Sequence, residues 1–247
     1  MENTLPPNTL PPKTLHYYLV ADRSGSMGPQ IAEVRDEINK HLVELASNAR
    51  ESNTHVLLHL LVFNGHLDWI FSGHRIDQVS PLTTQQYHAS GSTALFDAAG
   101  QAIEWASISC PNELDPEKEE VVIMIFSDGQ ENTSKKYNRE QFTQLVERHQ
   151  DKIGWTIAFS GCDLRGLSQL RNSKWRDDRM LSYSMEEKPE AIRDLAYNVS
   201  ERTKNRATFF KMVYEKNRIP HDPQKPGEIR FFSTQSKGSG SIWHGSG

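Results

Sequence analysis

Residues 121–129 read VVIMIFSDG, and this stretch decides the fold. Its first six residues are apolar without interruption and rich in β-branched side chains, which is typical of an interior strand of a parallel sheet, covered on both faces. The polar turn formers at residues 127–129 should end the strand. We therefore predict a central buried strand over residues 121–126, with Asp128 just beyond its carboxyl end.

Strand-like runs alternate with helical periodicity on both sides of this stretch. Further strands are predicted over residues 15–21, 55–63, 155–159 and 180–183. Apolar residues at three- and four-residue steps predict helices around residues 31–45, 95–106 and 142–146, and a long closing helix from residue 191. Asn64-Gly65 favours a tight turn, so residues 67–71 should return antiparallel. The pattern predicts an α/β fold: a doubly wound, mostly parallel sheet with one antiparallel edge strand and helices on both faces.

Both ends of the chain differ in composition from the part between them. The first residues repeat Thr-Leu with paired prolines, which favour extended polyproline II and cannot join the interior of a sheet. We expect a flexible Pro-rich arm over residues 1–14 and one domain over residues 15–215, a usual size for α/β folds. A C-terminal extension with a Gly/Ser-rich tail is expected over residues 216–247.

The overall composition narrows the class of protein. The 247 residues hold 28 Lys and Arg against 32 Asp and Glu, and the basic residues are scattered, so nucleic acid is not an expected partner. No apolar run approaches the ~20 residues that cross a bilayer, and no basic-then-apolar leader opens the chain, so we expect neither membrane insertion nor Sec-type export. Cys110 and Cys162 lack a zinc-like spacing, and we expect a reducing, cytoplasmic location.

Oxygen-bearing side chains follow two of the predicted parallel strands. Residues 22–26 read DRSGS after the first strand, and Asp128 follows the central one. Alternate side chains of an extended loop point to the same side, so Asp22, Ser24 and Ser26 should converge. Doubly wound sheets bind ligands beyond the carboxyl ends of their strands. A hard cation such as Mg²⁺, which takes six oxygen ligands, would suit these side chains.

A third segment adds one more hydroxyl. Residues 91–95 read GSTAL, between the predicted edge strand and the next helix, and place Thr93 near the same edge. Each segment alone also has a structural interpretation. Asp and Ser after a strand often cap the following helix, Asp-Gly is common in turns, and Thr93 suits a helix N-cap. The combination of all three segments favours a metal site.

Together these segments carry a family resemblance. Asp-x-Ser-x-Ser at residues 22–26, the Thr at position 93 and Ser-Asp-Gly at residues 127–129 resemble the metal-ion-dependent adhesion site of von Willebrand factor type A domains. The resemblance covers residues 15–213 and is nearest to small cytosolic proteins of bacteria and phages. It implies the Rossmann-like fold of that family.

The resemblance also implies roles for five residues. Ser24, Ser26 and Thr93 would coordinate the metal through their hydroxyls, whereas Asp22 and Asp128 would act through bound waters. The implied ion is Mg²⁺ or Mn²⁺, with Ca²⁺ as a further candidate. Neutral ligands leave much of the charge of the cation uncompensated, so an open coordination position attracts an external anionic oxygen. A carboxylate from a protein partner would fill it.

We therefore expect a non-enzymatic, metal-dependent protein-binding module whose partner supplies an Asp or Glu side chain. The resemblance implies partners such as an ATPase, a kinase or another component of a larger complex. One alternative is a Mg²⁺-dependent hydrolase or phosphatase that uses Asp22 and Asp128, although an aspartyl phosphatase would need Asp where Ser24 stands. A metal-stabilised structural subunit is the other alternative.

Five further residues have competing interpretations. Arg23 is expected to face solvent, or to select the acidic group of a partner by its charge. Glu131 and Asn132 are expected to brace the third segment, with contact to the partner as the alternative for Glu131. His55 and His59 have a spacing that would suit zinc on a helix, but the surrounding pattern favours a half-buried pair in the sheet.

Overall fold

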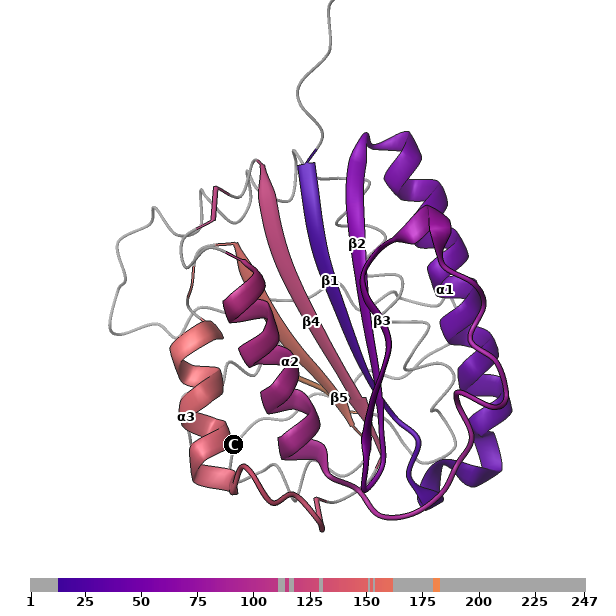
Figure 1. Cartoon of the computed structure of the whole chain (residues 1–247), viewed down its shortest axis with the longest axis vertical. Coiled ribbons are helices and arrows are strands. Elements are labelled where there is room, and N and C mark those ends of the chain that lie inside the picture. The colour runs from indigo at the N-terminus through magenta and orange to yellow at the C-terminus, as the bar shows by residue number, and fades with distance from the viewer. Residues whose placement is uncertain are drawn as a thin grey trace, which may run out of the picture.

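The computed structural model describes residues 13–110, 114–115, 118–128, 131–150, 152, 154–161 and 180–182. These residues form one sheet flanked by helices (Figure 1). The strands are β1 (Lys13–Asp22), β2 (Thr54–Phe63), β3 (Leu67–Arg75), β4 (Glu119–Ser127), β5 (Trp155–Gly161) and β6 (Met180–Ser182). The helices are α1 (Ile31–Glu51), α2 (Leu95–Ser109) and α3 (Arg139–Gln150), with short 3-10 helices η1 (Gly25–Gln30) and η2 (Ile76–Gln78).

The strand order is β3-β2-β1-β4-β5-β6, and neighbouring strands are parallel except for β2 and β3. The prediction of a doubly wound, mostly parallel sheet with an antiparallel edge strand is confirmed. From β1 the chain continues to β2 on one side, and from β4 it continues to β5 on the other. Such a divergence opens a crevice at the carboxyl ends of the two strands.

Helices cover both faces of the sheet, as predicted. Alternate residues of a strand point to opposite faces. In β1, Tyr17 and Leu19 pack in the layer that contains α1, whereas Tyr18 and Val20 pack in the layer that contains α2 and α3. Figure 1 shows α2 beside α3 and apart from α1. Strand β4 is buried on both faces, which confirms the prediction from its sequence. Among the helices described here, none has the length and apolarity needed to cross a bilayer.

Strand β1 begins earlier than predicted. Lys13 and Thr14 belong to the strand, which was predicted to begin at residue 15. A long-range ion pair accompanies this start: the Lys13 ammonium is buried and lies 2.7 Å from the Glu120 carboxylate of β4. The Thr14 amide also donates to the Lys118 carbonyl at 2.8 Å. Several predictions concern residues outside the described ranges. These are the rest of the arm, Cys162, the closing helix from residue 191 and the domain boundary at residue 215.

The two histidines of β2 form the half-buried pair that was predicted. His55 is exposed, whereas His59 is buried and stacks on Tyr18 with ring centroids 4.0 Å apart. Both lie on one face of a strand, so the spacing that suits zinc on a helix does not apply. The following strand, β3, extends to Arg75, beyond its predicted end, with Gly73 at a φ of 69°.

Gly100 in α2 lies under the ring of Tyr137. A Cβ at this position would come 2.5 Å from Cε2 of that ring, well inside van der Waals contact. The ring cannot swing away freely because its hydroxyl donates to Glu104. We expect Gly100→Ala to lower the free energy of unfolding, measured with denaturant, by about 1–3 kcal/mol despite the better helix propensity of Ala. Gly28→Ala is the matched control, since its Cβ would meet only Ala89, at 3.9 Å. Equal stability of wild type and Gly100→Ala would contradict this packing.

His41 of α1 is buried, with Nε2 3.0 Å from the Tyr17 hydroxyl. Burial lowers the pKa of His41 from 6.5 to about 4. Between these values the unfolded chain binds a proton that the folded chain does not, so stability falls as the pH falls through this window. We expect His41 to account for a loss of about 2 kcal/mol between about pH 7.5 and about pH 5.

Denaturant unfolding of wild type and His41→Gln at the two pH values measures this loss. Burial also lowers the pKa of His59 to about 4, so the variant should still lose stability in acid. The informative quantity is therefore the difference between the two proteins. If both lose the same amount of stability, His41 does not bind its proton as expected.

Candidate metal centre

Three loops meet at the carboxyl ends of β1 and β4. The first loop (residues 22–30) follows β1, and the second loop (residues 86–94) precedes α2. The third loop follows β4 and is described at residues 127–128 and 131–138. Because the parallel register pairs Ala21 with Phe126, the first and third loops leave the sheet side by side. The segments that carry the predicted ligands are thus neighbours in space.

Backbone hydrogen bonds join the first loop to the second. The Gly25 amide donates to the Gly91 carbonyl at 3.0 Å, and the Ser90 amide donates to the Arg23 carbonyl at 2.9 Å. Gly91 has a φ of 72°, in the left-handed region that favours glycine. A Cβ on Gly25 would come 3.3 Å from the Gly91 carbonyl oxygen. The two glycines therefore permit the close approach that fixes Thr93 relative to the first loop.

Asn64, predicted only as a turn residue, anchors the second loop. Its Nδ2 donates to the Ser90 carbonyl at 2.9 Å and lies 3.0 Å from the Ser90 hydroxyl. Its own carbonyl accepts the Ala94 amide at 2.8 Å, at the start of α2. The Asn-Gly signal correctly indicated the turn but carried no information on these longer-range bonds.

The Asp22 carboxylate is fully buried at the end of β1. Its Oδ1 accepts the Ser24 amide at 2.7 Å, and its Oδ2 accepts the Ser127 hydroxyl at 2.5 Å. The Tyr87 hydroxyl donates to the Asp22 carbonyl at 2.5 Å, which ties the second loop to this residue. Burial raises the pKa of Asp22 to about 6, and the charge of Asp128 adds to the rise against the opposing hydrogen bonds. A carboxylate in this state would be stabilised by a nearby cation.

Further hydrogen bonds connect the first loop to the third. The hydroxyls of Ser24 and Ser26 are 3.2 Å apart, and Ser26 donates to Oδ1 of Asp128 at 2.7 Å. Ser24 and Asp128 are buried, whereas Ser26 is exposed. The structure thus brings these three side chains together near Asp22, and the cluster opens to solvent at Ser26. Their role as metal ligands stays a prediction.

Thr93 joins the site through its backbone. Its amide donates to the Asn132 side chain at 2.9 Å, and the Asn132 amide donates to the Thr93 carbonyl at 3.1 Å. Within the described residues, the Thr93 hydroxyl makes no hydrogen bond to the other four predicted ligands. The helix-cap alternative is not what the structure shows, because the N-cap of α2 is Ala94, without a side-chain cap. Asn132 therefore braces the loops, as predicted.

Glu131 braces the third loop and holds it to α2. Its Oε1 accepts the amides of Thr133 and Ser134 at 2.8 and 2.6 Å. Its Oε2 accepts the Phe96 amide at 3.0 Å and the Ser134 hydroxyl at 2.6 Å. Both carboxylate oxygens are thus used within the chain, which favours the predicted bracing role over contact with a partner.

Asp97 is a bracing residue that the sequence did not reveal. Its carboxylate accepts three consecutive backbone amides of the third loop, from Lys135, Lys136 and Tyr137, at 2.8, 2.9 and 2.9 Å. The only local signal is an aspartate in the first turn of α2, where many helices carry an acidic residue. Its partners lie 38 to 40 residues along the chain.

Arg23 does not face solvent, contrary to the prediction. It is 8% exposed, and its guanidinium pairs with Asp68 of β3. Its Nη1 also donates to the Gln86 carbonyl at 2.9 Å. Asp68 lies on the edge strand β3, and its carboxylate pairs with Arg23 at the start of the first loop. The charge of Arg23 is therefore neutralised within the protein. The alternative that Arg23 selects an acidic partner by its charge loses its support.

The donor set suits a hard divalent cation. It combines two buried carboxylates with three hydroxyls, and Mg²⁺, Mn²⁺ and Ca²⁺ prefer such oxygen ligands. In the part of the chain that the structure describes, no three His, Cys, Asp or Glu side chains are grouped to hold a metal, so a metal site at these loops would have to include the hydroxyls. Burial raises the pKa of Asp22, and a cation nearby would favour its charged form. The residues present therefore fit such an ion.

No protein-family model matches the chain, and no curated protein matches it. Several solved structures are similar in fold. The PilB minor pilin of Streptococcus sanguinis has a TM-score of 0.55 at 11% identity, over 79% of this chain and 63% of the pilin, less than two thirds of its length. The von Willebrand factor domain of Mfa5, the type V pili tip protein of Porphyromonas gingivalis, has a TM-score of 0.53 at 10% identity, over 77% of this chain and 96% of that domain.

A von Willebrand factor type A structure from Catenulispora acidiphila has a TM-score of 0.49 at 13% identity, over 76% of this chain and 43% of that chain. At such identities a likeness concerns the fold and does not extend to activity. The match to nearly the whole Mfa5 domain agrees with the strand order and with helices on both faces of the sheet. The chain has the fold of a von Willebrand factor type A domain.

Proposed function

We propose that this chain is a non-enzymatic protein-binding module that holds its partner through a divalent cation at the three loops. The observation that carries the proposal is the hydrogen-bonded group of Ser24, Ser26 and Asp128, next to the buried Asp22 carboxylate. The hydroxyls of Ser24, Ser26 and Thr93 would bind the ion directly, and the two carboxylates would act through water. Mg²⁺ is the proposed ion, with Mn²⁺ and Ca²⁺ as the alternatives.

A protein carboxylate is the proposed ligand from outside the chain. Hydroxyl ligands leave much of the ion's charge uncompensated, so it attracts an anionic oxygen. Ser26 is exposed, which gives such an oxygen access. The carboxylate of an Asp or Glu side chain provides such an anionic oxygen. Two proteins of similar fold, the minor pilin PilB and the pili tip protein Mfa5, are parts of larger assemblies, and the proposal gives this chain a role of that kind. We propose that the partner is an ATPase, a kinase or another component of a larger complex, and that the two proteins meet in the cytoplasm.

The environment of Asp22 supports binding over hydrolysis. An aspartyl nucleophile must present a carboxylate oxygen to its substrate. Asp22 is fully buried, and both of its oxygens accept hydrogen bonds. Ser24 occupies the position at which such an enzyme would carry its acid–base carboxylate. The phosphatase alternative therefore lacks both an accessible nucleophile and a proton donor at this position.

Metal affinity should depend on the Thr93 hydroxyl. Thr93→Val keeps the shape of the side chain and removes one proposed ligand, so we expect Mg²⁺ to bind about 10- to 100-fold more weakly. Calorimetric titration of the full chain would measure the affinity, and titrations with Mn²⁺ and Ca²⁺ would rank the ions.

Ser92→Ala is the matched control for this titration. Ser92 is the exposed neighbour of Thr93 and is not a proposed ligand, so its loss should leave the affinity unchanged. Thr93 contacts Asn132 through its backbone, and these bonds should survive in Thr93→Val. Identical Mg²⁺ titrations for wild type and Thr93→Val would remove Thr93 from the ligand set.

Partner binding should need the ion, whereas folding should not. Both core layers are formed by side chains alone, so a chelator should leave the circular dichroism spectrum unchanged and remove only the stabilisation due to the bound ion. The immobilised chain should retain its partner from lysate in Mg²⁺ and release it in chelator. Thr93→Val should fail to retain the same protein, and Ser92→Ala should retain it.

Two results would count against the proposal. Retention that is indifferent to chelator would mean that the partner does not bind through the ion. Hydrolysis of p-nitrophenyl phosphate that requires Mg²⁺ and is lost in Asp22→Asn would favour the phosphatase instead.

A further inference from the structure

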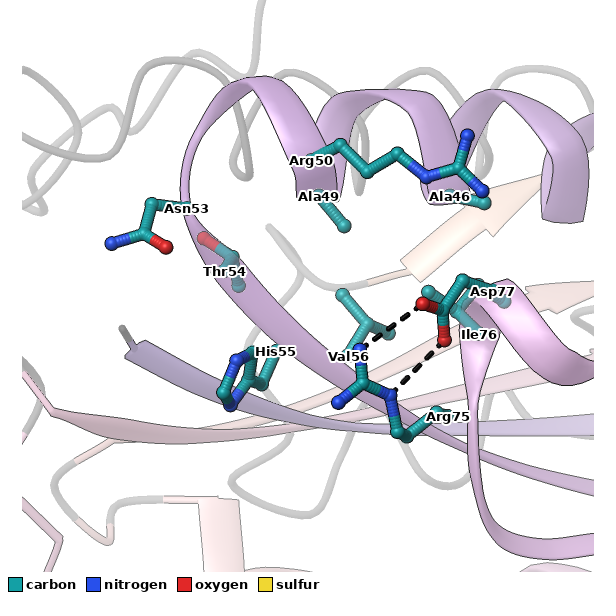
Figure 2. Close-up of a pocket in the computed structure, with 10 residues that line it drawn as sticks. All are labelled: Ala46, Ala49, Arg50, Asn53, Thr54, His55, Val56, Arg75, Ile76 and Asp77. Carbon is teal, nitrogen blue, oxygen red and sulfur yellow. Dashed lines mark hydrogen bonds and ion pairs between the residues drawn. The ribbon is translucent and has the colours of Figure 1, made fainter. Parts of the chain in front are cut away.

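A cavity of about 190 Å³, drawn in Figure 2, lies at the end of the sheet opposite the three loops. It is bounded by the last turns of α1, the start of β2 and the turn that follows β3. Thr54 at its edge is in register with Lys13, the first residue of β1, whereas the candidate metal centre lies beyond the last, Asp22. A strand of this length spans about 30 Å, so the cavity is separate from that centre.

Basic side chains outnumber acidic ones around this cavity. Arg50, His55 and Arg75 line it, and Asp77 is the one carboxylate among its lining residues. Even with His55 neutral, two guanidinium groups face one carboxylate. One positive charge at the cavity is therefore not balanced by its own walls.

The two arginines differ in how they are held. Arg75 donates from Nε and Nη2 to the two oxygens of Asp77, at 3.1 and 3.0 Å, which fixes its plane and leaves Nη1 outside the pair (Figure 2). In the described ranges, the Arg50 guanidinium has no hydrogen bond or ion pair. Arg75 is the main cause that lowers the pKa of Asp77, and the nearby charge of Arg50 adds to this effect. The cavity thus presents one oriented and one uncommitted guanidinium.

The remaining walls combine polar and apolar side chains, and Asn53 and Thr54 are the polar ones. Ala46, Ala49, Val56 and Ile76 line the cavity, and the last three are buried. A guanidinium binds carboxylate and phosphate oxygens through two parallel N–H groups, and an apolar wall favours a compact apolar body beside such a head group. We propose that this cavity binds a small organic oxyanion, a carboxylate or a phosphate monoester, with its head group between Arg50 and Arg75 and its apolar body against Ala49 and Val56.

The proposal can be tested with two probes that share an apolar body, phenyl phosphate and 3-phenylpropionate, titrated into the full chain at constant ionic strength. At least one should bind saturably and more tightly than inorganic phosphate, and the tighter of the two identifies the head group. Arg50→Gln should weaken binding about tenfold or more. Asp77→Asn should strengthen binding, since it removes the carboxylate that competes for Arg75.

Arg148→Gln is the matched control, because Arg148 is exposed on α3 and its loss changes the net charge equally. It should leave the affinity unchanged, and so should a chelator, which separates this test from that of the metal centre. Three results would overturn the proposal: no saturable binding of either probe, equal weakening in Arg50→Gln and Arg148→Gln, or inorganic phosphate binding as tightly as phenyl phosphate. Circular dichroism of each variant would confirm that it is folded.

Discussion

The Ser127 hydroxyl donates a hydrogen bond to the Asp22 carboxylate at 2.5 Å, and this bond joins the ends of the two central strands on which the candidate metal centre is built. It exists because β1 and β4 are parallel neighbours, so their carboxyl ends lie at one edge of the sheet. A slip of one residue would turn Asp22 to the opposite face. The two core layers, by fixing the register, therefore also bring Asp22 and Asp128 close to each other.

That proximity has an electrostatic consequence. Burial and the charge of Asp128 both disfavour ionisation of Asp22, whose pKa is raised to about 6. The adjacent Arg23 could have compensated this charge, but its guanidinium is directed to Asp68 on the edge strand. Arg23 therefore does not balance the charge of the buried Asp22 carboxylate. An ion pair between Arg23 and Asp22 would weaken the attraction of this site for a cation.

The parts of the structure that the sequence predicted are those that depend on local pattern. The period of apolar residues distinguishes strand from helix, and the turn after β2 indicates the antiparallel edge. The bracing contacts could not be found in this way. Arg23 and Asp68 are 45 residues apart, Lys13 and Glu120 are 107 apart, and Asp97 binds amides 38 to 40 residues away. No local pattern says which distant residue a charged side chain will meet.

The two sites proposed for this chain lie at opposite ends of α1. Helix α1 begins directly after η1, which is part of the first loop. The last turn of α1 contains Arg50. Its inner face, which includes Val34, Ile38 and Leu45, is fully buried against the sheet. Close packing of this kind resists small continuous displacements, so a shift of the helix would require the whole layer to repack. We therefore expect any rearrangement of the first loop on binding of the proposed ion to be absorbed within η1, which contains Gly28 and Pro29, and the two proposed sites to act independently.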